Sequence, residues 1–239
     1  MSVHRVHGAV ATIMKEDPTG GFWSRVIGLG IDEPVTDQVL DDVARIYREA
    51  GSERVMLQMS PETQPTEWES VLVGRGFTRS RSWVKLLRDT SPPPEPVSDL
   101  RLRELTADDA TSYAEVYWAA FEFPDPLFID WMAASVGMPN WHTFGAYDDD
   151  RLVSVGALFV HGDTGGFYGA GTLPSDRGRG GQGLMMAART RKAAELGLSW
   201  LSTETGSETP DNPNPSLHNM LRYGFTEIYE RYNWFLDLN

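Results

Sequence analysis

The residues best suited to chemistry lie in one glycine- and arginine-rich stretch, Arg177-Gly178-Arg179-Gly180-Gly181-Gln182-Gly183. Glycines let the backbone approach a ligand closely, and the first N–H groups of a following helix have no partner within that helix. The helix dipole also attracts anions, and the two arginines add positive charge in a chain whose formal net charge is −13. This stretch is therefore expected to bind an anionic group such as a diphosphate.

Other glycine-rich motifs fit this stretch less well. A Walker A loop is excluded because no Gly-Lys-Ser/Thr follows. A dinucleotide-binding fingerprint is disfavoured because the strands before the stretch are expected to be antiparallel. An RGG-type RNA-binding tract and a plain strand-to-helix turn stay open, although one short RGG-like segment in an acidic chain is poor support for RNA binding.

Composition restricts the remaining function classes. The chain has no cysteine, which excludes disulfides, thiolate metal sites and a cysteine nucleophile. Its five histidines show no metal-ligand spacing, so no metal is expected. The acidic charge opposes binding of nucleic acid, and the apolar stretch 9–14 is too short for a signal or membrane segment. A cytoplasmic protein without nucleic-acid or membrane partners is expected.

The elements that must position the stretch fall on one side of a proline-rich segment. Four of the five residues from Pro92 to Pro96 are prolines, which lack a backbone donor and favour an extended linker. This predicts domains at 1–90 and 100–239, joined by a linker at 91–99. In the second domain, periodicity predicts strands at 100–105, 141–147, 151–160, 166–173, 198–205 and 226–236. Helices are predicted at 106–121, 127–136, 180–196 and 215–223.

The first domain carries a weaker copy of the end of this pattern, with helices expected at 37–50 and 66–74 and strands at 54–59 and 77–87. The two copies share a short segment, read as Leu72-Val73-Gly74-Arg75-Gly76-Phe77-Thr78 and Met220-Leu221-Arg222-Tyr223-Gly224-Phe225-Thr226. Each segment precedes a strand with a tryptophan, Trp83 or Trp234. We interpret this as an internal repeat whose first copy lacks the glycine-rich stretch and is not catalytic.

From residue 100 onward the chain resembles the GNAT superfamily of acyl-CoA-dependent N-acyltransferases. The match consists of Leu173-Pro174 at a strand end, then Arg177-Gly178-Arg179-Gly180, with Gln182 where a second glycine is usual. The resemblance implies an α/β (α+β) fold with a mixed, mostly antiparallel sheet flanked by helices, and a smaller truncated GNAT-like N-terminal domain. It also implies a splayed strand pair, 166–173 against 198–205, that accommodates the pantetheine arm of the cofactor. The residues implied for binding acetyl-CoA are Gly171, Thr172, Leu173, Arg177, Gly178, Arg179, Gly180, Gly181, Gln182, Gly183, Asn214 and Asn219.

The catalytic groups are less clear, because the tyrosine that protonates the CoA thiolate in many members is replaced by Met220. A backbone N–H near Leu173 is a candidate for holding the oxyanion, and Glu204 is the candidate base. Tyr223, His218 and Tyr168 are left as candidate acids. Substrate contacts are expected from Glu122, Asp125 and Tyr168.

The expected activity is acetyl transfer from acetyl-CoA to a primary amine of a small molecule or peptide, by direct attack in a ternary complex. The alternative from another class is a catalytically degenerate acyl-CoA sensor or scaffold, suggested by the missing tyrosine. The sequence leaves open the acceptor, the acyl-chain preference and a homodimeric state.

Overall fold

The structure is a computed structural model that describes residues 1–17, 19–123 and 129–238. Its contacts group the chain into two compact units. Unit 1 contains Met1–Val84 and Tyr229–Asn239, and unit 2 contains Lys85–Ile228. Strand β5 (Thr78–Asp89) therefore begins in unit 1 and ends in unit 2, and β11 (Thr226–Asp237) does the reverse.

Unit 1 is a mixed sheet with two helices. Its strands follow the order β1-β2-β3-β4-β11-β5, in which β3 and β4 are parallel and β4 and β11 antiparallel. The further elements are β1 (Ser2–Val6), β2 (Ala9–Ile13), β3 (Arg25–Ile27), α1 (Asp37–Glu49), β4 (Arg54–Gln58), η1 (Pro61–Thr63) and α2 (Trp68–Gly74).

The core of unit 1 lies between the helices and the sheet. Thr36 is the N-cap residue of α1, and its side chain accepts a hydrogen bond from the Val39 amide. The apolar stripe of the helix includes Tyr47. Trp68 of α2 and Trp234 of β11 belong to the same buried cluster. The last strand of the sequence thus supplies a core tryptophan to the unit formed mainly by the first 84 residues.

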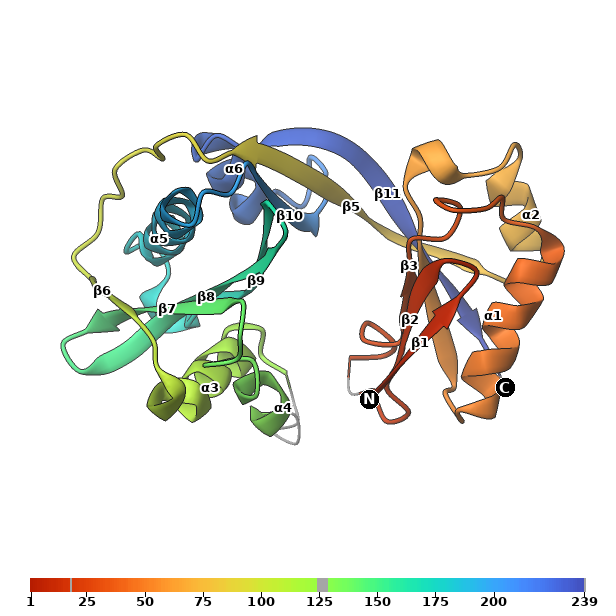
Figure 1. The fold of residues 1–239 in the computed structure, drawn as a ribbon, viewed down its shortest axis with the longest axis horizontal. Helices are drawn as coiled ribbons and strands as arrows, with labels where there is room; N and C mark the ends of the chain where they lie inside the picture. The colour runs from red at the N-terminus through yellow and green to blue at the C-terminus, as the bar shows by residue number, and fades with distance from the viewer. Residues whose placement is uncertain (18, 124–128, 239) are drawn as a thin grey trace. The chain divides into compact units, whose positions relative to one another are not determined.

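Unit 2 is a mostly antiparallel sheet covered on both faces by helices (Figure 1). Its strands follow the order β5-β10-β9-β8-β7-β6, and only the pair β9–β10 among those with a described register is parallel. The elements are β6 (Arg101–Glu104), η2 (Ala107–Asp109), α3 (Ala110–Ala120), α4 (Ile129–Ala133), β7 (Trp141–Asp148), β8 (Arg151–His161), β9 (Thr164–Thr172), η4 (Pro174–Asp176), α5 (Gly181–Glu195), β10 (Trp200–Gly206) and α6 (Pro215–Arg222).

Two buried clusters hold the layers of unit 2 together. On one face, Tyr113 and Ala114 of α3 pack with Val155 and Ala157 of β8. On the other face, Met185 of α5 packs with a cluster that includes Phe144, Ala146 and Val153. Val153 belongs to a different cluster from Val155 because the register of β7 and β8 shifts next to it, and α3 and α5 cover opposite faces of the sheet (Figure 1).

The two Gly-Phe-Thr segments form the same turn. Gly76 and Gly224 both have φ +85°, a left-handed conformation that favours glycine at the end of a helix. The Phe77 amide donates to the Leu72 carbonyl at 2.9 Å, and the Phe225 amide donates to the Met220 carbonyl at 3.1 Å. The following strands, β5 and β11, are each 12 residues long. Helix, turn and strand are thus repeated in the structure as well as in the sequence.

The observed elements agree with the sequence expectation from residue 100 onward except for the helix expected at 127–136, and unit 1 contains three further strands. That helix is described only at Ile129–Ala133, and residues 127 and 128 lie outside the described residues. Strand β1 exposes four of its five residues and β3 has only three residues, so neither carries a strong alternating pattern. The expected domains, 1–90 and 100–239, stay a prediction. The contacts place residues 85–90 in unit 2 and residues 229–238 in unit 1, because β5 and β11 pass from one unit into the other.

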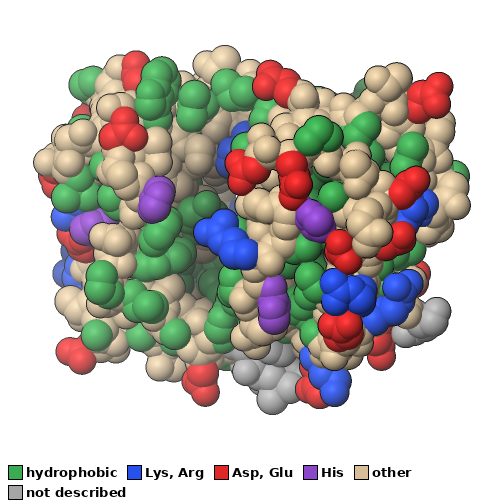
Figure 2. Space-filling view, turned by 45° about the vertical axis from the view of Figure 1, so that its right-hand side comes forward, with side chains coloured by type: hydrophobic (Ala, Val, Ile, Leu, Met, Phe, Trp, Pro, Cys, Tyr) green, Lys and Arg blue, Asp and Glu red, His purple; other side chains and the backbone are tan. Residues whose placement is uncertain are grey.

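On the face shown in Figure 2, hydrophobic side chains reach the surface among acidic and basic ones. Within the described residues, no helix combines the length and the apolar character needed to cross a membrane.

Candidate functional site

The glycine-rich stretch forms the turn between η4 and α5, as the sequence predicts. Gly178 and Gly180 have φ +83° and +82°, which favour glycine, and Gly180 is the N-cap residue of α5. Among the described residues no side-chain cap is found at this end of the helix, and the Leu184 amide donates to the Gly180 carbonyl at 3.0 Å. The amides of the first turn, which include Gly181 and Gln182, are therefore left for an outside acceptor.

Arg179 is held by three carboxylates and does not extend freely from the turn. Its guanidinium donates to Asp99 at 2.6 Å, to Asp148 at 2.9 Å and to Asp176 at 3.1 Å. Asp176 is 2% exposed and also accepts two bonds from Arg151, at 2.8 and 2.9 Å. These bonds from Arg151, together with one from Ser175, lower the pKa of Asp176 to about 2. The network fixes the start of the turn, and it largely neutralises the charge of Arg179.

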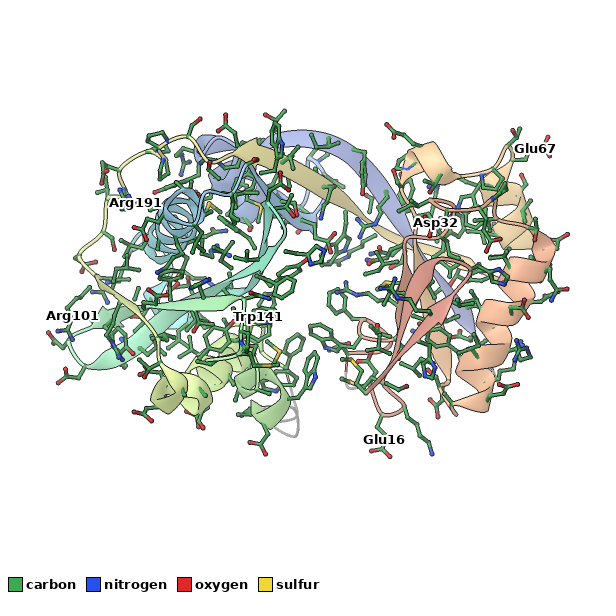
Figure 3. All side chains as sticks on the ribbon, in the orientation of Figure 1. Glu16, Asp32, Glu67, Arg101, Trp141 and Arg191 are labelled. Atoms are coloured by element: carbon green, nitrogen blue, oxygen red, sulfur yellow. The ribbon has the colours of Figure 1, made fainter. Side chains whose placement is uncertain are left out.

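The proline-rich segment packs against the turn. Ser98 donates to the Arg179 carbonyl at 2.6 Å, and the Val97 carbonyl lies where a Cβ on Gly180 would be. Arg191, labelled on α5 in Figure 3, donates to Glu95 at 2.6 Å. One side of the turn is thus covered by this segment, which also explains why residue 180 must be glycine.

Arg177 is the second arginine of the turn. Its guanidinium donates to the Ala120 carbonyl at 3.0 Å, which joins the turn to the end of α3. The Arg177 side chain is exposed, as is Gly178 beside it. Open glycine backbone, uncapped amides and one exposed cation are the features that an anionic diphosphate requires, so the residues present fit this group.

Strands β9 and β10 separate next to the turn. Their pairing is confined to Trp200 with Thr164, Leu201 with Gly165 and Ser202 with Gly166. Within the described structure, 167–172 and 203–206 continue without pairing to each other. We call the space between these two segments the strand split. Main-chain groups along it are available to an extended ligand arm.

Two of the residues singled out in the sequence flank the strand split. Ser202 and Gly166 are partners in a parallel pair, so they share a face of the sheet, and Glu204 and Tyr168 lie two residues further along the same strands. Tyr168 is 47% exposed and Glu204 is half-buried. The structure thus places a carboxylate and a phenol on the same face, one on each side of the split.

An aromatic row borders Tyr168 on this face. The Trp141 ring, at the start of β7 (labelled in Figure 3), lies 6.0 Å from the Tyr168 ring and 5.0 Å from the Phe159 ring. Large aromatic side chains in partly exposed positions form apolar contacts with ligands.

Helix α6 is tied to both α5 and β10. The Asn214 side chain accepts hydrogen bonds from the Ser216 and Leu217 amides and donates one to Thr205 at 3.0 Å. These bonds hold the start of α6 beside the end of β10. Gln182, the departure from the family motif, accepts from Asn219 at 2.7 Å. Gln182 also donates to Ser216 at 2.8 Å. The residue that replaces a glycine therefore fastens the start of α5 to α6.

The candidate acids differ in their surroundings. Tyr223 is buried, its hydroxyl lies where a Cβ on Gly183 would be, and burial raises its pKa. His218 lies 2.8 Å from Glu208 on an exposed part of α6. Met220 is buried. Of these candidates, Tyr223 is the one whose hydroxyl contacts the first turn of α5, at Gly183.

The remaining expected residues lie along β9 and after α3. The Leu173 amide donates to the Val153 carbonyl at 2.9 Å, so this amide is engaged and not free to hold an oxyanion. The hydroxyl of buried Ser154 forms hydrogen bonds with the Gly171 carbonyl and with the Thr172 hydroxyl. Glu122 is exposed in the segment after α3, and Asp125 lies outside the described residues.

Sequence reasoning missed two buried polar residues near the strand split, Arg189 and Tyr113. Both are buried at helix positions where an apolar residue is usual. For Arg189, the sequence signal is that an arginine follows two small residues, Ala187 and Ala188, in the helix. Among the described residues, no group of three or more histidines, aspartates or glutamates is arranged to hold a metal ion.

Comparison with known proteins gives matches in structure only. No protein-family model matches the chain, and no curated protein matches it. A GCN5-related N-acetyltransferase from Sphaerobacter thermophilus matches with a TM-score of 0.71 at 14% identity, over 97% of this chain and 77% of that chain. One from Kribbella flavida matches with a TM-score of 0.69 at 17% identity, over 98% and 88%. A tandem GNAT protein from the clavulanic acid biosynthesis pathway matches with a TM-score of 0.61 at 14% identity, over 90% and 75%.

These likenesses extend over nearly the whole chain, so they include unit 1 as well as unit 2. The mixed, mostly antiparallel sheet, the helices on its two faces, the split between β9 and β10 and the glycine turn before α5 agree with what the sequence resemblance implies. The chain therefore has the fold of the GCN5-related N-acetyltransferase (GNAT) superfamily.

Proposed function

We propose that the protein is an N-acetyltransferase that transfers an acetyl group from acetyl-CoA to a primary amine of a small molecule or peptide. One observation carries this proposal: an uncapped helix start and a strand split lie next to each other in a GNAT fold. A diphosphate needs the first feature, and a long extended arm with amide groups needs the second.

The main chain of the turn would hold the cofactor. The amides from Arg177 to Gly183 would hold the diphosphate, and Arg177, which is exposed, would add charge. Arg179 contributes through its carboxylate network, which fixes the turn, and not through direct contact. Gly171 and Thr172 border the pantetheine arm along β9, and Asn214, Asn219 and Gln182 hold α6 beside it. When bound, acetyl-CoA supplies the activated acyl group.

The acceptor amine would enter on the face that carries Tyr168 and Glu204. Glu204 takes a proton from the ammonium form of the amine, directly or through water, since only the neutral amine is a nucleophile. The amine nitrogen then forms a bond to the acyl carbon and loses its second proton to solvent, and the carbon–sulfur bond breaks to release a thiolate. The two substrates bind together and no covalent acyl-enzyme forms, because holding both reactants in place removes much of the entropic barrier.

The proton for the thiolate is assigned to Tyr223 or to solvent. Burial keeps the Tyr223 hydroxyl protonated at neutral pH, and this hydroxyl lies against the first turn of α5. The negative net charge of the chain and the acidic residue at the split favour a cationic acceptor. The aromatic row of Trp141, Phe159 and Tyr168 provides an apolar wall for its body.

A second function is an acyl-CoA-binding sensor or scaffold without catalysis. The observation that favours it is Met220, a buried residue that cannot donate a proton, at the position where many members have a tyrosine. A sensor keeps the glycine turn and the strand split but has no need of Glu204.

Calorimetry with CoA, followed by thiol release from acetyl-CoA with a panel of amines, tests both functions. Binding together with amine-dependent release supports the enzyme, and binding without release from any amine supports the sensor. Gly180→Asp should abolish CoA binding, because the new side chain would collide with the Val97 carbonyl and place a negative charge beside the diphosphate. Unchanged affinity in this variant would remove the site assignment.

A further inference from the structure

A buried arginine without an acidic partner lies inside unit 2. Arg189 on α5 is 3% exposed, and its Nε donates to the Met185 carbonyl at 2.9 Å. Its Nη1 donates to the Ala157 carbonyl at 3.4 Å, and the guanidinium carbon lies 4.0 Å from the centre of the Phe167 ring. Both carbonyl acceptors are neutral, and no ion pair joins Arg189 to a carboxylate of the described residues.

This arrangement is costly and calls for an explanation. Removing a charged group from water without an opposite charge is strongly unfavourable, and buried arginines are usually paired. Burial lowers the pKa of the Arg189 guanidinium to about 9, so the group still carries its charge at neutral pH. A methionine or leucine at this position would pack against Phe167 at no such cost.

The charge lies at the beginning of the strand split. Phe167 is the first residue of β9 after Gly166, which is the last one paired with β10. Arg189 follows Gly181 by eight residues along α5, a rise of about 12 Å. The diphosphate of a bound cofactor would lie at the start of α5, and its arm would follow the split toward Gly166. The sulfur at the end of that arm would therefore lie toward Arg189.

A β-bulge in the pairing of β8 with β9 lies next to the Arg189 guanidinium. The register of β8 and β9 shifts between Val155 and Ala157, so that Gly169 and Ala170 of β9 lie opposite Gly156 alone. Tyr113, 1% exposed on α3, donates to the Gly169 carbonyl at 2.8 Å from one face of the sheet. Arg189 bonds the Ala157 carbonyl from the other face. Of these two buried groups that hold the bulge, only Arg189 is charged.

We propose that Arg189 is an electrostatic positioning residue whose buried charge stabilises the thiolate that leaves when the amine attacks. This inference rests on the proposed acetyltransferase function. The electron pair of the breaking carbon–sulfur bond stays on the sulfur, and the field of the nearby cation lowers the energy of that anion before any proton arrives. Arg189 thereby makes a proton donor at the Met220 position unnecessary.

The other titratable groups near this end of the split do not supply a comparable positive charge. They are Tyr113 on α3, Tyr168 on β9, Glu204 on β10 and Tyr223 at the end of α6. Burial raises the pKa of Tyr113 well above its usual value and raises that of Tyr223, so both phenols are neutral at neutral pH. Glu204 carries a negative charge when ionised, and it would disfavour a thiolate.

The ultraviolet absorbance of the thiolate of bound CoA, followed as a function of pH, tests the proposal without a turnover assay. In the wild-type protein we expect the thiol of bound CoA to titrate about one pH unit below that of free CoA. Arg189→Gln keeps hydrogen-bond donors but removes the charge, and it should return the titration to that of free CoA. Arg189→Lys keeps a charge and should retain part of the shift.

Tyr113→Phe is the matched control, because it releases the other side of the bulge without changing any charge. The thiol titration in this variant should match the wild type. A wild-type thiol that titrates like free CoA overturns the proposal, as does an Arg189→Gln protein that binds CoA and keeps the shift. If the wild-type protein does not bind CoA at all, the proposed function itself fails. If it binds CoA but the thiol of the bound CoA titrates like free CoA, only the role of Arg189 fails. Should Arg189→Gln fail to fold, Arg189→Met takes its place in the titration, because methionine can still pack against Phe167 and carries no charge.

Discussion

Gly180 shows at the scale of one residue why the glycines of the turn are not interchangeable. Its left-handed φ disfavours any other residue, and a Cβ there would also collide with the Val97 carbonyl. Gly178 has the same φ, but its Cβ position is open, and Gly206 has an open Cβ position without a left-handed φ.

We therefore predict a graded series of alanine variants. Gly206→Ala should leave the melting temperature unchanged, Gly178→Ala should cost about 1 kcal/mol, and Gly180→Ala should cost more because strain and collision add. CoA affinity should fall in the same order. Thermal unfolding and calorimetry measure the series, and equal effects at residues 178 and 180 would show that the Val97 contact has no consequence.

Asp176 makes a second prediction at this scale, on pH dependence. Its folded pKa of about 2 lies below its ordinary value of 3.8, so its ionised form contributes stability that is fully present above about pH 4. This contribution is lost as the pH falls through 2. Asp176→Asn should thus lower the free energy of unfolding by roughly 2 kcal/mol at pH 7.

The difference between the wild type and Asp176→Asn should shrink as the pH falls from 4 toward 2. Urea unfolding at a series of pH values measures this. Asp150→Asn is a suitable control, because Asp150 is exposed and its ion pair with Arg101 spans 3.8 Å. A pH-independent difference for Asp176→Asn would mean that its ion pairs with Arg151 and Arg179 are not the cause.

At the scale of elements, α6 depends on one side chain for its start. Asn214 accepts two amide hydrogen bonds from α6 and donates to the end of β10. Asn214→Ala should lower the free energy of unfolding by about 1–2 kcal/mol, because it removes both functions. Asn214→Asp keeps the acceptor oxygen and should lose less. Chemical unfolding of the two variants measures the difference, and equal losses would assign the whole effect to the β10 contact.

The elements of unit 2 could be predicted from the sequence because their signals are local. Thr106 and Asp109 form a capping box before α3, and Gly197 follows α5 with φ +72°. The turn before α5 followed from its glycines in the same way. Strands β1 and β3 could not be found, because their residues are mostly exposed or too few to show a period.

Most partners of the site residues could not be predicted, since they come from distant segments. Arg179 was expected to offer its charge to a ligand, and it is held by Asp99 and Asp148 from distant segments and by Asp176 three residues before it. Gln182, which stands where a second glycine is usual, bonds two residues of α6 through its side chain, and the sequence motif did not indicate these partners. The placement of Glu204 beside the split did follow from the resemblance, because it depends only on strand order and register.

At the scale of the whole molecule, the two units share strands, and this leads to a prediction about cooperativity. Each unit contains part of β5 and part of β11, so loss of either unit removes the partners of a strand that continues into the other. We expect one unfolding transition in calorimetry. Leu57→Ala in unit 1 and Leu158→Ala in unit 2 remove fully buried side chains and should each lower that single transition temperature. Two transitions, each shifted by only one variant, would contradict this.

The place of β11 in the sheet also bears on how the chain is synthesised. β11 lies between β4 and β5 in strand order, yet it follows every other strand in the sequence. On the ribosome, β4 and β5 emerge long before the strand that separates them, and each carries open backbone groups until then. These edges are the sites where a nascent chain of this kind first needs protection by a chaperone.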